Sequence, residues 1–229
     1  GTTLTFTAAP SNNSGNNIFV YYLFRTVATV DHPSTSALTA TNGTLTGDLN
    51  VTGTTTLSTK LATTNLGTGA VLQVQYTQYT DTFTQSYTAD TNETIGASAL
   101  SVNITPKSTS SIIKLDAHIF HEFSAVNTQD NHVWFFYRDS TALKAPAAGS
   151  RPCGISMSTI NNSTDAGSTP EIVNYTYFDT PSTTSQITYK IGLLTRFSGT
   201  LNVNRTVTDN DNNSHERGIS YISATEIGG

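Results

Sequence analysis

The sequence predicts an all-β protein, and two observations support this fold class. First, the 229 residues include 43 Thr, 24 Ser and 19 Asn. These side chains bond to their own backbone in non-helical conformations, and Thr is β-branched, so the composition favours strands and turns over helices. Second, apolar residues alternate with polar ones along much of the chain, which is the period of a strand. No segment has a convincing helical period.

The composition divides the chain into three parts. Residues 1–32 contain two strand-like segments, TTLTFTAAP and NNIFVYYLFRTVATV, joined by the turn-like SNNSGNN. We expect a β-hairpin there that ends an upstream module. Residues 33–70 are rich in Thr and Gly with sparse leucines, and we expect a patterned connector. In residues 71–229 aromatic residues are more frequent and strands are longer, so this part is expected to be a packed domain.

About eight strands are expected in residues 71–229, one of them over the segment VLQVQYTQYTDTFTQSYT at 71–88. They fit two packed sheets, in a jelly-roll-like β-sandwich. The segment SIIKLDAHIFHEF at 111–123 has the clearest alternation. One face of it carries Ile113, Leu115, Ala117, Ile119 and Phe123, and the other carries Lys114, Asp116, His118 and Glu122. We expect the first face to be core and the second to be solvated.

The stretch GTLTGDLNVTGTTTLST at 43–59 has one apolar row on an otherwise polar ribbon. A single row buries too little apolar surface to offset the backbone entropy of about 1 to 2 kcal/mol per residue. Three chains wound about one axis would bury each row against the other two, and the glycines permit close approach. We therefore expect a homotrimer. The residues expected at its axis are Leu45, Leu49, Val51, Leu57 and Leu61.

Charge and composition exclude several classes of function. The net charge is −5 and the isoelectric point is near 5.4, whereas nucleic-acid recognition needs a clustered basic face. The longest apolar run, at 18–24, is far below the ~20 residues of a membrane-spanning helix, so no membrane insertion is expected. The single cysteine, Cys153, excludes an intrachain disulfide. Because the chain begins at Gly1 and its one methionine is Met157, we expect a missing N-terminal part.

Three stretches resemble the tail fibres of tailed bacteriophages. GTLTGDLNVTGTTTLST is similar to their β-helical connectors, and FDTPSTTSQITYKI and GISYISATEIGG resemble the late strands of a C-terminal tip domain common in phage fibres, particularly those of marine phages. The resemblance covers roughly residues 41–229, and 1–30 more loosely resemble a short fibre hairpin repeat. It implies an intertwined trimeric β-helical connector and a homotrimeric fibre tip that binds a receptor on the bacterial surface. It carries over no receptor residue, because the tip loops match no known motif.

The resemblance leads us to expect a virion protein of the tail fibre, assembled in the host cytoplasm. Its partners would be two further copies of the chain, upstream fibre or tail proteins, and a host receptor that is a glycan or an outer-membrane protein. Two alternatives stay open. One is a purely structural trimerisation and shaft-capping domain, and the other is a glycan depolymerase.

Two polar loops are the candidates for receptor contact, because a fibre approaches its host end-on and only loops at one end of the sandwich would reach the receptor. Amide and carboxylate groups bond sugar hydroxyls, and His215 and Arg217 could pair with anionic groups of a polysaccharide. Alternatively, both loops are ordinary hairpin turns at opposite ends. The candidate residues are Asn127, Gln129, Asp130, Asn131, His132, Asp209, Asn210, Asp211, Asn212, His215 and Arg217.

Other patterns suggest metal sites but lack a required feature, and no metal or cofactor is expected. DNDNNSHERG at 209–218 opens like a calcium loop, but Ser214 replaces the glycine and Ser220 the bidentate glutamate. His118 and His121 lie on opposite faces of a strand, which disfavours a zinc site within one chain. A three-fold axis could still gather three copies of one histidine around a metal.

Two further patterns concern sugar binding and catalysis. The aromatic run at 134–137 could form a platform for a sugar ring, but we expect it to serve a core face and a subunit interface. No catalytic residues are expected, because no pair of carboxylates is selected by spacing and no nucleophile elbow is present. The sequence therefore predicts a binding protein and not an enzyme.

Overall fold

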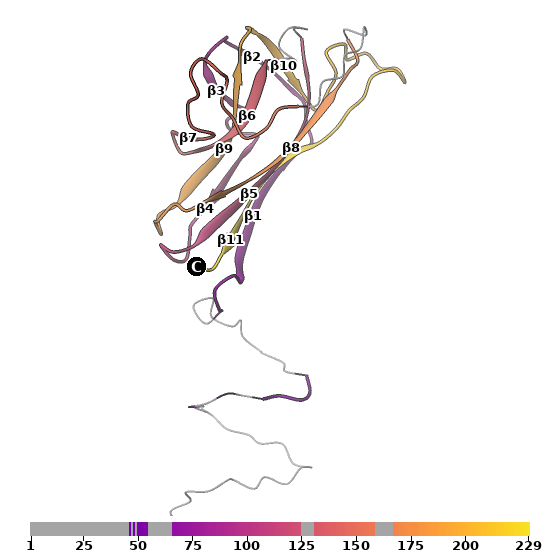
Figure 1. Ribbon diagram of the computed structural model, residues 1–229. Helices are drawn as coiled ribbons and strands as arrows, with labels where there is room; N and C mark the ends of the chain where they lie inside the picture. The colour runs from indigo at the N-terminus through magenta and orange to yellow at the C-terminus, as the bar shows by residue number, and fades with distance from the viewer. Residues whose placement is uncertain (1–45, 47, 49, 55–65, 125–130, 159–166) are drawn as a thin grey trace, which may run out of the picture. The chain divides into compact units, whose positions relative to one another are not determined.

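The computed structural model of the protein describes residues 46, 48, 50–54, 66–124, 131–158 and 167–229 (Figure 1). The chain forms two compact units, Gly1–Thr56 and Leu57–Gly229. In the first unit the described residues are all exposed, including Val51 of the expected trimer axis. The expected hairpin at 1–32 lies outside the described residues, as do the axis residues Leu45, Leu49, Leu57 and Leu61.

The second unit is all-β in its described part and contains two antiparallel sheets (Figure 1). The first sheet consists of β1 (Val71–Tyr79), β2 (Phe83–Tyr87), β5 (Ile112–Phe123), β8 (Glu171–Asp179), β10 (Gly199–Val203) and β11 (Ser220–Ile227). β5 is the longest of these strands. β8 pairs along one of its edges, while β11 and β10 share the other edge, at 112–118 and 121–123. β1 continues the sheet beyond β11, and β2 continues it beyond β10.

The second sheet repeats this arrangement around β9. It consists of β3 (Asn92–Ile95), β4 (Ser101–Ile104), β6 (His132–Arg138), β7 (Thr141–Leu143) and β9 (Ile187–Thr195). β6 pairs along one edge of β9, and β3 and β4 share the other edge. β7 extends the sheet beyond β6. The described residues include no α-helix, and hence no helix long and apolar enough to cross a membrane.

The core lies between the inward faces of the two sheets. On β5, buried Ile113, Leu115 and Ile119 alternate with half-buried polar residues, as the sequence predicts. The second sheet contributes fully buried residues that include Trp134, Phe136, Tyr189, Ile191 and Leu193. Burying one side chain of this size contributes about 1.5 to 3 kcal/mol. The predicted all-β fold with two packed sheets is therefore confirmed.

Residues 71–88 form two strands where the sequence predicts one. β1 and β2 are separated at residues 80–82, where the chain is held by Asn204, which lies just after β10. The Asn204 amide donates from Nδ2 to the backbone oxygens of Tyr79 and Asp81, at 2.8 Å each. Asn204 has a φ of 60°, a left-handed conformation that asparagine adopts more readily than most residues. This contact joins segments far apart in the sequence, so no local pattern indicates the break.

One buried carboxylate links the two sheets at the end of β8. Asp179 accepts a hydrogen bond from Arg138 Nη1 at Oδ1 (2.9 Å) and from the Tyr189 hydroxyl at Oδ2 (2.7 Å). Burial raises the pKa of Tyr189 well above its ordinary value of 10.0, and the hydrogen bond to Asp179 adds to the effect. The Tyr189 hydroxyl therefore remains a hydrogen-bond donor at neutral pH.

The two ends of the sandwich differ in what they carry. At one end, the Gly69 N–H donates to the Gly228 oxygen (2.7 Å) and the Gly228 N–H donates to the Ala70 oxygen (2.8 Å). The start of β1 and the C-terminal residues therefore lie together. At the other end, β5 finishes at Phe123 and β6 begins at His132 (Figure 1). The end of β5 and the beginning of β6 thus lie away from the start of β1.

Candidate functional site

The polar segment between β10 and β11 folds back on itself as a loop at residues 205–217. An isolated antiparallel bridge joins Arg205 to Arg217. Next to it, the Gly218 N–H donates to the Asn204 oxygen at 3.3 Å. These contacts close the loop at its base, where β10 ends and β11 is about to begin.

Buried Glu122 of β5 fixes this loop to the first sheet. The sequence places Glu122 on the solvated face, but its exposed fraction is only 1%. Its Oε2 accepts from the Val207 N–H at 2.6 Å, and its Oε1 accepts from the Thr169 N–H and hydroxyl at 2.9 and 3.1 Å. One carboxylate therefore holds both the 205–217 loop and the segment that leads into β8, and together these segments cover this part of the sheet.

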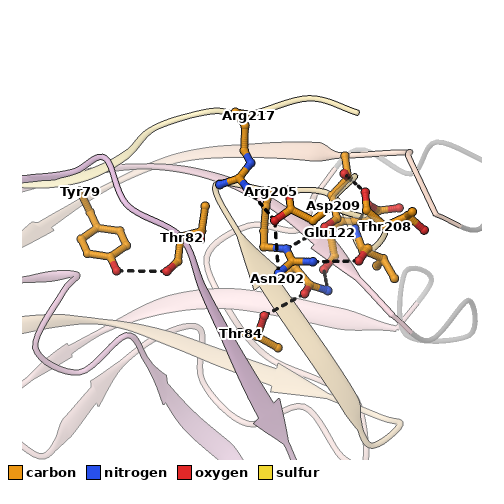
Figure 2. A network of polar contacts seen from close by, with 11 residues as sticks. Tyr79, Thr82, Thr84, Glu122, Asn202, Arg205, Thr208, Asp209 and Arg217 are labelled. Carbon is orange, nitrogen blue, oxygen red and sulfur yellow. Dashed lines mark hydrogen bonds and ion pairs between the residues drawn. The ribbon is translucent and has the colours of Figure 1, made fainter. Parts of the chain in front are cut away.

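Asp209 organises the outer part of the loop, where Figure 2 shows it beside two arginines. Its Oδ2 lies 2.6 Å from Arg217 Nη2 and 3.5 Å from Arg205 Nη1. Two of the predicted receptor residues, Asp209 and Arg217, are thus paired with each other. A calcium loop would use the Asp209 carboxylate as its first ligand, and here the two guanidinium groups already compensate that charge.

The exposed tip of the loop consists of Asn210, Asp211 and Asn212. Asn212 Oδ1 accepts from the Ser214 N–H at 2.8 Å and lies 2.9 Å from His215 Nδ1, so these predicted residues also shape the loop. Within the part of the chain that the structure describes, the side chains of Asn210 and Asp211 have no hydrogen-bond partner. The tip therefore presents an amide and a carboxylate on a fixed backbone.

The other predicted loop, between β5 and β6, is described only at its end. Asn131 is exposed, and its backbone oxygen accepts from the Arg196 N–H at 2.9 Å. The prediction for His132 is wrong, because it is the first residue of β6, it is buried, and it shares the inward face with Trp134. Its Nε2 accepts from the Ser158 N–H at 2.9 Å. The candidates Asn127, Gln129 and Asp130 lie outside the described residues.

The structure places the described parts of both loops toward the same end of the sandwich. Asn131 leads into β6, beside the end of β5 at Phe123. Glu122, the residue before Phe123, contacts Val207 of the other loop. Figure 1 shows the yellow 205–217 loop on the side of the molecule away from the start of β1 and the C-terminus. The described residues of the two loops therefore do not lie at opposite ends of the sandwich.

The sequence did not indicate a buried polar cluster of Ser158, His121 and Glu171. Ser158 Oγ lies 2.8 Å from His121 Nε2, and Glu171 Oε2 lies 3.6 Å from the same nitrogen. In a serine-hydrolase triad the acid contacts the opposite ring nitrogen. Here the other nitrogen, Nδ1, faces the Ile119 oxygen at 3.3 Å, and the Trp134 indole donates to Ser158 Oγ at 3.0 Å. The cluster lacks the geometry of a nucleophilic site, because Ser158 and Glu171 face the same nitrogen of His121. All three side chains are also buried.

The aromatic run at 134–137 serves the interior of this chain. Trp134 and Phe136 belong to the core between the sheets, and Phe135 is buried on the opposite face of β6. Its ring lies over Gly192 of β9, where a Cβ atom would come within 2.4 Å of the ring. Trp134, Phe135 and Phe136 are therefore not available to a subunit interface, and that expectation is wrong for these three residues. For the same reason they do not form an exposed platform for a sugar.

Comparison with known proteins adds little to this geometry. No protein-family model matches the chain, and no curated protein matches its sequence. Among solved structures, the crystal structure of the infectious bursal disease virus VP2 subviral particle is similar over 68% of this chain, with a TM-score of 0.32 and 14% sequence identity. The chain covers 41% of that structure's length. A similarity at this level carries no information on function.

Proposed function

We propose that this chain is the distal domain of a homotrimeric tail fibre of a tailed bacteriophage, and that it binds a receptor on the host bacterial surface. The observation that supports the proposal most is the 210–212 tip. It carries unpaired polar groups and is fixed by Asp209 and Glu122 to a rigid sheet, toward the end away from the start of β1. Polar loops held by a rigid scaffold are the usual position of binding residues.

The chemistry of the tip suits a receptor rich in hydroxyl groups. Asn210 supplies two N–H donors and a carbonyl acceptor, and Asp211 supplies carboxylate acceptors. Bonds to a charged acceptor are stronger than those between neutral groups, so Asp211 would contribute most. The receptor would be a surface glycan or the polar surface of an outer-membrane protein. In the virion, upstream fibre or tail proteins would hold the N-terminal side.

The proposal is tested with the double variant Asn210→Ala, Asp211→Ala, in which Asp209 and Asn212 keep the loop shape. Fluorescent wild-type chain is first screened by flow cytometry against a panel of Gram-negative strains. On a strain that binds, the double variant should bind at least tenfold more weakly, a loss of about 1.4 kcal/mol. Its melting temperature should be nearly unchanged, since exposed polar substitutions are usually within about 0.5 kcal/mol.

The matched control is Thr184→Ala, Gln186→Ala. These residues are also exposed and polar, but they lie in the turn between β8 and β9, at the end near the start of β1. This control should bind cells at full strength. Full binding by the Asn210→Ala, Asp211→Ala variant as well would show that the tip is not the receptor site. A chain that decorates no strain and blocks no phage adsorption would support the structural, shaft-capping alternative.

A further inference from the structure

The outward face of the first sheet carries a second polar surface, which includes no residue of the 205–217 loop. Strand register places outward side chains in rows that cross β8, β5, β11 and β1. One row consists of Thr176, Asp116, Ser223 and Tyr76, and the neighbouring row consists of Asn174, His118, Tyr221 and Gln78. Every residue in these rows is exposed or half-buried. The four strands therefore present a solvent-accessible face.

A groove of about 410 Å³ lies across these two rows. Its outward lining side chains are Asp116, Asn174, Thr176, Tyr221 and Ser223. All of them carry a hydroxyl, an amide or a carboxylate, and Tyr221 adds an aromatic ring. The groove thus combines hydrogen-bonding groups with one flat apolar surface.

Contacts within the protein fix the acidic side of the groove. Asp116 Oδ1 accepts from the Thr176 hydroxyl at 2.6 Å, and Asp116 Oδ2 accepts from Lys114 Nζ at 2.8 Å. A carboxylate has about four acceptor positions, so each oxygen retains capacity for a ligand. The Asp116 charge is compensated by Lys114, and its geometry is set before any ligand arrives.

The amide and aromatic side of the groove is fixed in a similar way. Asn174 Oδ1 lies 2.7 Å from His118 Nδ1, and the His118 ring stacks on Tyr221 with a centroid separation of 5.4 Å and an interplanar angle of 13°. Within the described part of the chain, Asn174 Nδ2 and the hydroxyls of Tyr221 and Ser223 have no protein partner. These three groups are therefore available to a ligand, and their preorganisation lowers the entropic cost of binding.

The charges and hydrogen-bonding groups select the chemical class of the ligand. An anionic ligand would meet the Asp116 carboxylate, and the nearby cation, Lys114, is already paired. An apolar ligand would leave the polar groups of the groove unpaired, which is costly. Sugar hydroxyls both donate and accept, so they match a mixed set of amide, hydroxyl and carboxylate groups. The apolar face of a sugar ring can also pack on Tyr221, whose ring is apolar and whose hydroxyl is polar.

The distribution of apolar residues argues against a second copy of the chain as the occupant. Protein interfaces have an apolar centre and a polar rim. Here the order is reversed, because the polar groups lie at the centre on β5 and β11. Apart from Tyr221 of β11, the large exposed apolar side chains of these four strands lie on the outer two, with Tyr76 of β1 71% exposed and Phe178 of β8 58% exposed. We propose that this groove binds a neutral glycan, with Asn174, Asp116 and Ser223 bonding its hydroxyls and Tyr221 packing on a sugar ring.

The test is affinity electrophoresis of the full chain in native gels that contain dextran, mannan, galactan or polygalacturonate. At least one neutral polysaccharide should retard the wild-type chain, while the anionic polygalacturonate should not. Asn174→Ala and Tyr221→Ala should each weaken the retardation at least fivefold. The matched control is Asn103→Ala, because Asn103 is also an exposed strand residue with one side-chain hydrogen bond, to Thr188 on the second sheet. This control should be retarded like wild type.

Several outcomes would overturn the inference. These are the absence of retardation by all three neutral polysaccharides, equal retardation of the Asn174→Ala and Asn103→Ala variants, or stronger retardation by polygalacturonate. If sedimentation shows that Asn174→Ala changes the oligomeric mass, the groove would instead be an interface between copies of the chain.

The inference holds whether or not the chain is a fibre tip, because it concerns a different site. The Asn210→Ala, Asp211→Ala variant should keep its retardation in the gel, so a failure of either proposal is visible separately.

Discussion

Deleting residues 218–229 is expected to abolish folding of the sandwich. β11 lies inside the first sheet, with β1 paired along one edge and β5 along the other. Its Ile222 and Ala224 are fully buried, and its Glu226 carboxylate accepts from the Lys107 N–H and the Ser111 hydroxyl, both at 2.6 Å. Losing these contacts removes more free energy than the roughly 5 to 15 kcal/mol by which a domain is usually stable.

The measurement for this deletion is the soluble fraction of expressed protein together with the fluorescence of Trp134, which is the one tryptophan in the sequence and is buried. We expect aggregated protein, or soluble protein with the emission of an exposed indole. Deletion of Gly229 alone is the control and should leave both readouts close to wild type. A soluble 218–229 deletion with native emission would contradict the position assigned to β11.

Replacing Glu122 by alanine is expected to lower the free energy of unfolding by about 3 kcal/mol. The Glu122 carboxylate accepts three hydrogen bonds from Val207 and Thr169, and removing this buried acceptor costs about 1 to 3 kcal/mol for each donor that loses it. Glu122→Gln should recover part of this loss. Glutamine has nearly the volume of glutamate and keeps one acceptor oxygen, but its NH₂ group would face an N–H donor of Val207 or Thr169.

Urea denaturation followed by Trp134 fluorescence measures the effect of Glu122→Ala. The matched control is Glu93→Ala, because Glu93 is also a strand glutamate and accepts one long hydrogen bond, from the Thr88 N–H at 3.3 Å. Its loss should stay within about 0.5 kcal/mol, as is usual for residues near the surface. Equal, small losses for the two variants would show that Glu122 does not hold the loop.

Features that depend on local alternation could be predicted from the sequence. The pattern at 111–123 correctly divides β5 into an apolar face and a polar face, because neighbouring side chains of a strand point to opposite sides. The exception is Glu122, which lies on the predicted polar face of β5 but is buried. Thr169 and Val207, which are far away in the sequence, cover Glu122. The local sequence pattern around Glu122 therefore does not indicate that it is buried.

Strand order and the groove could not be predicted for the same reason. The sequence favours a structural role for the last strand because Ile219, Tyr221 and Ile227 share one face. The strand is indeed structural, but that face points outward, and Ile222 and Ala224 face the core. Only the pairing of β11 with β5 brings Tyr221 beside His118 and completes the groove. β3, β4 and β7 have three or four residues each, too few for a period to be recognised.

The mass of the full chain in solution tests the account of a trimeric fibre domain most directly. The apolar row that includes Val51 has no expected partner within one chain, and in the first unit the described residues are exposed. Sedimentation velocity or multi-angle light scattering at micromolar concentration should give three times 24.4 kDa, or 73.2 kDa. Dilution should not change this value if the copies are intertwined. A single species of 24.4 kDa would contradict the trimer, and with it the proposal of a fibre tip.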